Sequence, residues 1–163
     1  PVAFNVDQAL LSERYLALQK SLHPDNFVTA DAQEQRIAMQ KSTEVNDALK
    51  TLKDPILRAE AIIALNTGKT QDLEQKSTQD VTFLMQQLEW REELENIEQS
   101  QDENALESFA KRVKKETKEM LTALEAQLNE QQWPTAAQFC DKLRFLKKLA
   151  DEISQVEERL FEL

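Results

Sequence analysis

Glycine occurs only once in the 163 residues of this chain, at Gly68, and proline occurs four times. Sandwiches, barrels and doubly wound sheets need many tight turns, and these two residues form most of them. Glutamine, glutamate, leucine, alanine and lysine, which are mostly good helix formers, dominate instead. We therefore expect an all-α fold. Phosphate-cradling and dinucleotide-binding loops are excluded, because both need several glycines close together.

The composition also limits the chemistry and the partners. One cysteine, Cys140, and one histidine, His23, are too few for a zinc site of the usual ligands, so we expect no metal and no cofactor. The absence of an internal disulfide, of a long apolar run and of a leader before Pro1 favours a cytosolic protein. A net charge of −10 works against nucleic-acid binding, and we expect protein partners and no membrane.

Residues 66–80 (NTGKTQDLEQKSTQD) form the least apolar stretch of the chain, and they show no helical stripe. Polar segments that contain glycine often separate domains. We predict a first module at 1–66, a linker at 67–79 and a second module at 80–163.

The first module is predicted to be a helical hairpin followed by a short helix. Asp7 can cap a first helix that stops before Pro24, because proline disfavours helical geometry in the residue that precedes it. Asp31 begins a capping-box-like pattern, and Asp54 with Pro55 starts the short helix. The apolar positions expected to be buried in the hairpin are Leu11, Tyr15, Leu18, Leu22, Ile37, Ala38, Val45, Ala48, Leu49 and Leu52.

The second module is predicted to contain three longer helices. Asp80 can cap the first, residues 100–103 (SQDE) match a capping box for the second, and Trp133 and Pro134 mark the turn before the third. Long helices joined by short turns imply an antiparallel three-helix bundle. The expected core positions are Phe83, Trp90, Leu94, Ile97, Leu106, Phe109, Val113, Met120, Leu124, Leu128, Phe139, Leu143, Leu146, Leu149, Ile153, Val156 and Leu160.

The loop of the predicted hairpin contains the tripeptide His23-Pro24-Asp25. Taken alone, these residues are as well explained as ordinary turn formers with a chance histidine. In context, the tripeptide at the tip of a helix pair resembles the J-domain of DnaJ-type co-chaperones. The same resemblance extends to VNDAL at 45–49, DP at 54–55 and RA at 58–59. It implies that the tripeptide contacts a DnaK-class chaperone and triggers ATP hydrolysis by that partner.

The helix before the loop offers a second surface for the same partner. Lys20 points away from the apolar stripe and Arg14 lies at its flank, positions that also suit simple solvation of the helix. By resemblance, J-domains use basic residues on this helix to meet an acidic surface of the chaperone. Glu13 shares this face, and Asn26 stands where many members of the family have lysine, so the sequence departs from the usual charge pattern.

The first helix of the second module has two apolar faces. Val81, Leu84, Met85 and Leu88 lie opposite the predicted core stripe and beside several glutamates. Exposed apolar patches rimmed by charge are often binding sites, although packing on the linker or on the first module would also cover this face. Phe145 is expected at the edge of the core, bordering the same patch.

Three segments of the second module match one family. TFLMQQLEWREEL at 82–94, FAKRVKK at 109–115 and KLRFL at 142–146 resemble HscB, the J-type co-chaperone family of iron–sulfur cluster assembly. The resemblance implies that the bundle binds the cluster scaffold protein, IscU, and presents it to the dedicated chaperone HscA. Asn96 stands where a further acidic residue is expected. The implied scaffold-binding residues are Leu84, Met85, Leu88, Glu89, Glu92 and Phe145.

The family also begins with a short apolar helix, and Pro1 stands just after the place where it would end. Relatives from animals and fungi are mitochondrial, and some carry a cysteine-rich extension that is not seen before this J-like module. We therefore expect a bacterial, cytoplasmic protein, or a mitochondrial matrix protein if the source is eukaryotic.

Two other functions stay open at this point. One alternative is a general J-domain co-chaperone with another client, and the other is a non-catalytic helical adaptor. An enzyme is disfavoured, because no nucleophile, base and orienting group come together in the sequence. The basic run at 111–115 (KRVKK) is better explained as a solvated face than as a nucleic-acid site. The sequence leaves the oligomeric state undecided.

Overall fold

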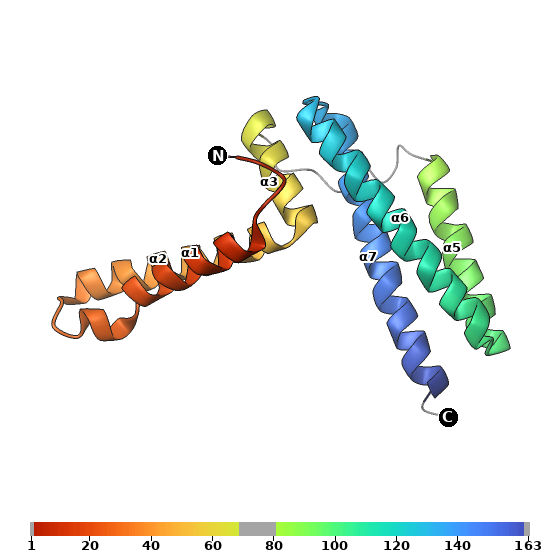
Figure 1. Cartoon of the computed structure of the whole chain (residues 1–163), viewed down its shortest axis with the longest axis horizontal. Helices are drawn as coiled ribbons and strands as arrows, with labels where there is room; N and C mark the ends of the chain where they lie inside the picture. Colours follow the sequence, from red (N-terminus) through yellow and green to blue (C-terminus); the bar gives the residue numbers. More distant parts are fainter. Residues whose placement is uncertain (1, 69–80, 162–163) are drawn as a thin grey trace. The chain divides into compact units, whose positions relative to one another are not determined.

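The structure is a computed structural model that describes residues 2–68 and 81–161, and all regular elements in these ranges are helical. The expected all-α fold is thereby confirmed (Figure 1). The elements are α1 (Gln8–Ser21), the short 3₁₀ helix η1 (Pro24–Phe27), α2 (Ala32–Lys53), α3 (Pro55–Thr67), α5 (Val81–Ser100), α6 (Glu103–Asn129) and α7 (Trp133–Phe161).

The chain forms two compact units, residues 1–62 and 63–163, so that their boundary falls within α3. The predicted limit at Asn66 lies near the end of the same helix. Most of the predicted linker, at 69–79, lies outside the described residues, as does the predicted cap Asp80.

The helices of the first unit begin where the sequence predicts. Side-chain oxygens of Asp7, Asp31 and Asp54 accept backbone N–H groups in the first turns of α1, α2 and α3, at 3.1, 2.7 and 2.8 Å. Each aspartate satisfies N–H donors that have no partner within the helix. These caps set where each helix begins, and Asp31 therefore marks the end of the loop between α1 and α2.

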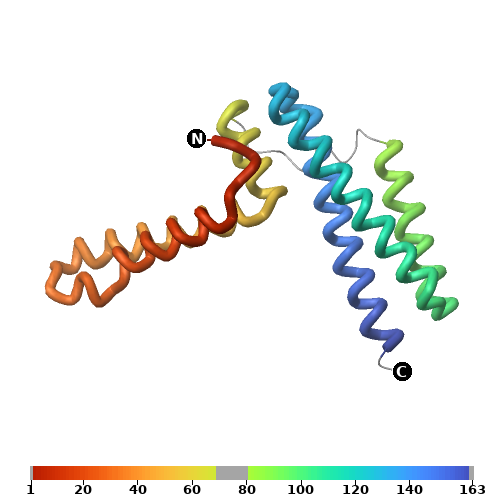
Figure 2. The backbone as a smooth tube through the Cα atoms, in the orientation of Figure 1, coloured from red at the N-terminus to blue at the C-terminus, as the bar shows by residue number. Residues whose placement is uncertain are grey.

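The hairpin of α1 and α2 is less buried than the sequence suggests. The two helices lie side by side along their length (Figure 2). No residue of α1 is buried, and Leu18, Ile37 and Ala48, which were expected in the core, are exposed. The predicted buried stripe is wrong in this respect because a layer of two helices covers only the strip where they touch. Among the expected hairpin positions, Ala38 is buried.

A polar network joins the two helices of the hairpin. The Tyr15 hydroxyl donates to Asn46 Oδ1 at 2.6 Å, and Gln19 Nε2 donates to the same oxygen at 2.8 Å. Ser42 Oγ donates to Gln19 Oε1 at 3.1 Å. Hydrogen bonds require closer alignment than apolar contacts, so this network sets the register of α1 against α2.

Arg58, near the start of α3, ties three segments of the first unit together. Its Nε donates to the Phe4 carbonyl at 2.5 Å and its Nη1 donates to the Leu52 carbonyl at 2.6 Å. The guanidinium also lies over the Phe4 ring, with Cζ 4.9 Å from the centroid. Burial lowers the pKa of Arg58, and the nearby Asp54 carboxylate opposes that change. The buried cation is therefore stabilised by carbonyl oxygens and an aromatic face.

The second unit has a well-packed core between α6 and α7, which run antiparallel, with α5 against both (Figure 2). The predicted apolar stripes of α6 and α7 are largely confirmed, and Cys140 is fully buried among them. Only Leu94 and Ile97 of α5 are buried, so its first half is less enclosed than its second. The buried residues of α6 and α7 are Leu106, Phe109, Val113, Leu124, Leu128, Ala136, Ala137, Cys140, Leu143, Phe145, Leu146, Leu149, Ile153 and Val156.

The start of α6 differs from the prediction. The capping residue is Asp102, whose side chain accepts the Ala105 N–H at 3.0 Å, and Ser100 is the last residue of α5. Gln101 between them has a φ of 54°, in the left-handed region. The chain therefore reverses one residue after α5 ends, and the next helix begins after Asp102. In the described residues, no helix is long and apolar enough to cross a membrane.

Candidate functional site

The His23-Pro24-Asp25 loop is built on η1 at the end of the hairpin away from α3 (Figure 1). His23 caps η1, because its Nδ1 accepts the Asp25 backbone N–H at 3.2 Å. The same Nδ1 lies 3.4 Å from Asp25 Oδ2. The side chains of His23 and Asp25 are 61% and 86% exposed, so both remain accessible. The loop therefore presents an imidazole and a carboxylate side by side on the surface.

The two predicted cations of this surface lie on the neighbouring helix. Arg14 and Lys20 are exposed on α1, and Lys20 belongs to its last turn. A cation at this end of a helix interacts favourably with the carbonyl groups that have no partner within the helix. Lys20 also lies close to the loop in space, because its backbone carbonyl accepts a hydrogen bond from the Asn26 side chain at 2.7 Å. Arg14 lies about one and two-thirds turns earlier along α1.

The predicted scaffold surface lies on the first half of α5. Val81, Leu84, Met85 and Leu88 are exposed large apolar residues, and Glu89 and Glu92 are exposed beside them. On a helix, residues three and four positions apart are neighbours, so Leu84, Met85 and Leu88 form one continuous apolar surface. We call these three residues with Glu89 and Glu92 the α5 face. It has the apolar centre and charged edge of a typical protein-binding surface.

Phe145, the sixth predicted residue, lies beneath the α5 face. It is 8% exposed, and its ring meets that of Phe83 edge-on with 5.9 Å between centroids. The Arg91 guanidinium lies 5.7 Å from the Phe145 ring centroid, and Arg91 Nη1 lies 3.8 Å from Glu152 Oε1. In the described structure Phe145 therefore supports α5 against α7, while the exposed residues project from α5.

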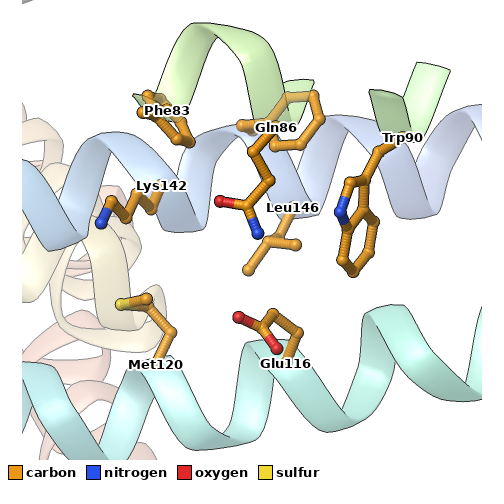
Figure 3. Close-up of a pocket in the computed structure, with 8 residues that line it drawn as sticks. Phe83, Gln86, Trp90, Glu116, Met120, Lys142 and Leu146 are labelled. Carbon is orange, nitrogen blue, oxygen red and sulfur yellow. The ribbon is translucent and has the colours of Figure 1, made fainter. Parts of the chain in front are cut away.

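A small, partly open pocket of about 20 Å³ lies between the first half of α5 and the helices α6 and α7. Figure 3 shows Gln86 and Trp90 pointing from α5 toward α6, with Glu116 and Met120 pointing back. Phe83, Phe145, Lys142 and Leu146 complete the lining. A space of this size holds about one water molecule. The inner side of this half of α5 therefore packs against a small pocket whose lining includes polar side chains.

Sequence reasoning assigned Phe83 to the core and gave no role to Lys142. The Lys142 Nζ lies 5.9 Å from the Phe83 ring centroid and 5.6 Å from that of Phe139, so the lysine covers two half-buried aromatic rings. Lys142 lies within the KLRFL segment at 142–146, and the family resemblance of that segment is the sequence signal that could have pointed to this lysine. Lys142 and Phe145 both line the pocket between α5, α6 and α7.

The basic run of α6 is a surface of mixed charge. Lys111 pairs with Glu107 at 3.3 Å, Arg112 pairs with Glu93 on α5, and Val113 is buried. These pairings agree with the prediction of a solvated face. Within residues 2–68 and 81–161, no group of three histidine, cysteine, aspartate or glutamate side chains is arranged to hold a metal ion.

Comparison with known proteins shows how far the resemblance extends. The co-chaperone protein HscB homolog of Haemophilus influenzae is 69% identical over 163 residues, which cover all of this chain and 94% of that protein. The chain belongs to the HscB family. The HscB homolog of Pasteurella multocida is 59% identical and is also covered to 94%. The family description "HSCB C-terminal oligomerisation domain" matches residues 79–154.

Solved HscB structures share the fold as well. The chaperone HscB from Vibrio cholerae gives a TM-score of 0.88 at 40% identity, covering 98% of this chain and 94% of that one. The human co-chaperone protein HscB gives a TM-score of 0.84 at 28% identity, covering 96% and 78%. The HscB fold is therefore common to bacterial and human members, and the predicted family assignment is confirmed.

Proposed function

We propose that this HscB-family co-chaperone binds an IscU-type iron–sulfur scaffold protein, delivers it to an HscA-type DnaK-class chaperone and stimulates the ATPase of that chaperone. The chain itself carries out no catalysis in this proposal. Its role is to assist the maturation of iron–sulfur proteins in the bacterial cytoplasm.

One observation supports this proposal most strongly: two exposed recognition surfaces belong to two different compact units. The loop in the first unit presents His23 and Asp25 to solvent, as a site for the chaperone requires. The α5 face in the second unit presents apolar side chains edged by carboxylates, which suits a client with an apolar, basic surface. A chain with one binding surface in each unit can hold two proteins at once.

Holding both partners on one chain raises the local concentration of the scaffold beside the chaperone. When both binding surfaces belong to one chain, the second binding step is intramolecular and no longer depends on the bulk concentration of the second partner. The co-chaperone then links two events that would otherwise depend on separate encounters. His23, Pro24 and Asp25 act on the chaperone, with Arg14 and Lys20 beside them, while Leu84, Met85, Leu88, Glu89 and Glu92, supported by Phe145, hold the scaffold.

The test is the steady-state ATPase rate of the HscA-type chaperone with the IscU-type scaffold and this protein. The wild type is expected to stimulate the rate, and His23→Ala is expected to abolish the stimulation without unfolding the chain, because His23 is exposed. Replacing Leu84 and Leu88 together by alanine should shift stimulation to higher scaffold concentration. No stimulation by folded wild-type protein would refute the proposal.

The two alternatives give different results in the same assay. A general J-domain co-chaperone with another client would need His23 but would be indifferent to the leucine pair. A helical adaptor would show no dependence on His23. The His23→Ala variant and the Leu84 and Leu88 double variant together distinguish the proposed function from both alternatives.

A further inference from the structure

Asn26, which follows the His23-Pro24-Asp25 tripeptide, forms hydrogen bonds through its side chain to the end of α1. Its Nδ2 donates to the Lys20 carbonyl at 2.7 Å and to the Ser21 carbonyl at 3.3 Å. Both acceptors are carbonyl oxygens, so the nitrogen of the amide must be the atom that faces them. These carbonyls belong to the last turn of α1, where no partner exists within the helix. The Asn26 side chain therefore caps the C-terminus of α1 from outside that helix.

The backbone of the same residue holds the loop. The Asn26 N–H donates to the His23 carbonyl at 2.9 Å and so closes the first turn of η1. The Asp25 N–H is already bound by His23 Nδ1. Asn26 thus contacts the loop through its main chain and α1 through its side chain. The residue is a direct connection between the tripeptide and the helix that carries Lys20.

We propose that Asn26 is a positioning residue of the chaperone-binding surface. Its amide fixes the His23-Pro24-Asp25 loop against the end of α1, so that the tripeptide and the basic helix surface meet the chaperone as one rigid unit. This inference rests on the proposed function. Rigid surfaces bind more tightly because less conformational entropy is lost on association.

In this proposal, the hydrogen bonds of Asn26 take the place of the lysine that the J-domain resemblance leads one to expect after the tripeptide. An asparagine side chain is short, and from η1 it reaches the two carbonyls of α1 directly. The sequence alone indicated a missing charge at this position. The structure shows a hydrogen-bonded link in its place.

Gln35 on α2 offers a matched control. Its Nε2 donates to the Phe27 carbonyl at 3.0 Å and to the Ala30 carbonyl at 3.2 Å. It therefore also makes two amide-to-carbonyl hydrogen bonds at an exposed site, but they hold the downstream part of the loop and do not involve the tripeptide. Changing Gln35→Ala removes the same kind and number of contacts as Asn26→Ala.

The experiment measures chaperone ATPase stimulation as a function of co-chaperone concentration for wild type, Asn26→Ala, Asn26→Asp and Gln35→Ala. The half-saturating concentration should rise about three- to tenfold in both Asn26 variants, since one hydrogen-bonded link is worth about one factor of ten or less. The maximal rate should not change, because His23 and Asp25 are intact. The half-saturating concentration for Gln35→Ala should stay within about twofold of wild type, although this variant also loses two amide-to-carbonyl hydrogen bonds.

Hydrogen exchange of the Asp25 and Asn26 amides supplies a readout that does not depend on the chaperone. These two amides should exchange faster in both Asn26 variants and stay protected in Gln35→Ala. Equal shifts of half-saturation in the Asn26 and Gln35 variants, or unchanged half-saturation with Asn26→Ala, would overturn the positioning role alone. Absence of stimulation by the wild type would instead overturn the proposed function on which the role depends.

Discussion

Replacing Leu84 and Leu88 together by alanine tests the α5 face quantitatively. These side chains are 38% and 67% exposed, so their removal creates little cavity and should change the free energy of unfolding by less than about 1 kcal/mol. Full burial of a leucine side chain contributes about 1.5–3 kcal/mol. If the scaffold covers what is now exposed, the two changes together weaken binding by about 2 kcal/mol.

About 1.4 kcal/mol corresponds to a factor of ten, so the Kd for the scaffold should rise roughly thirtyfold. Isothermal titration calorimetry of the scaffold protein into wild type and variant measures this directly. A thermal melt of each sample establishes that the variant is folded.

The first unit provides a closely matched control pair. Leu10 and Leu16 on α1 are 40% and 65% exposed, almost the same as the α5 pair. Changing both to alanine removes the same chemistry and the same exposed surface from another helix, and should leave the scaffold Kd within about twofold of wild type. Equal losses in the two double variants, or an unchanged Kd in the α5 variant, would show that the α5 face is not the binding surface.

Three further predictions concern the free energy of unfolding of the unit that carries each residue, measured by chemical denaturation. Phe109→Ala should lower the free energy of unfolding by about 3–5 kcal/mol, because the ring is fully buried between helices, and a smaller loss would mean that the bundle core repacks. Arg58→Ala should cost about 2–4 kcal/mol, since the carbonyls of Phe4 and Leu52 lose a charged donor, whereas an unchanged value would show that water replaces it. Tyr15→Phe should cost about 0.5–1.5 kcal/mol through the lost bond to Asn46, and no loss would refute the role of the network in the hairpin.

Local sequence signals were sufficient for most of the architecture. Aspartates at three helix starts and the three- and four-residue spacing of apolar side chains fix where the helices begin and which sides face inward. The start of α6 was misplaced because SQDE fits a capping box in sequence, while the left-handed Gln101 makes Asp102 the cap. Which of two nearby polar residues, Ser100 or Asp102, caps the helix depends on how the chain reverses at Gln101, and that is a tertiary property.

The candidate sites could be located from sequence only in part. The exposed apolar residues of α5 are visible as a pattern, because a second apolar face is unusual on an amphipathic helix, whereas the tripeptide is recognised through its resemblance to J-domains. Burial is harder to infer, since it depends on how many helices surround a side chain. Leu18 and Ile37 were therefore overestimated as core residues. The link from Asn26 to the end of α1 joins residues of a loop and a helix and has no signature in composition or period.

The uneven burial of the two units has a consequence for how the protein responds to heat. A hairpin that depends on exposed hydrogen bonds opens at a lower free energy than a bundle with a continuous apolar core. The melting curve is then expected to contain two transitions, with the hairpin first. A partner that binds only the folded hairpin raises its stability by mass action, by about 2.7 kcal/mol at one hundred times its Kd. The upper transition should not respond, so the gap between the two melting temperatures becomes a direct gauge of chaperone occupancy.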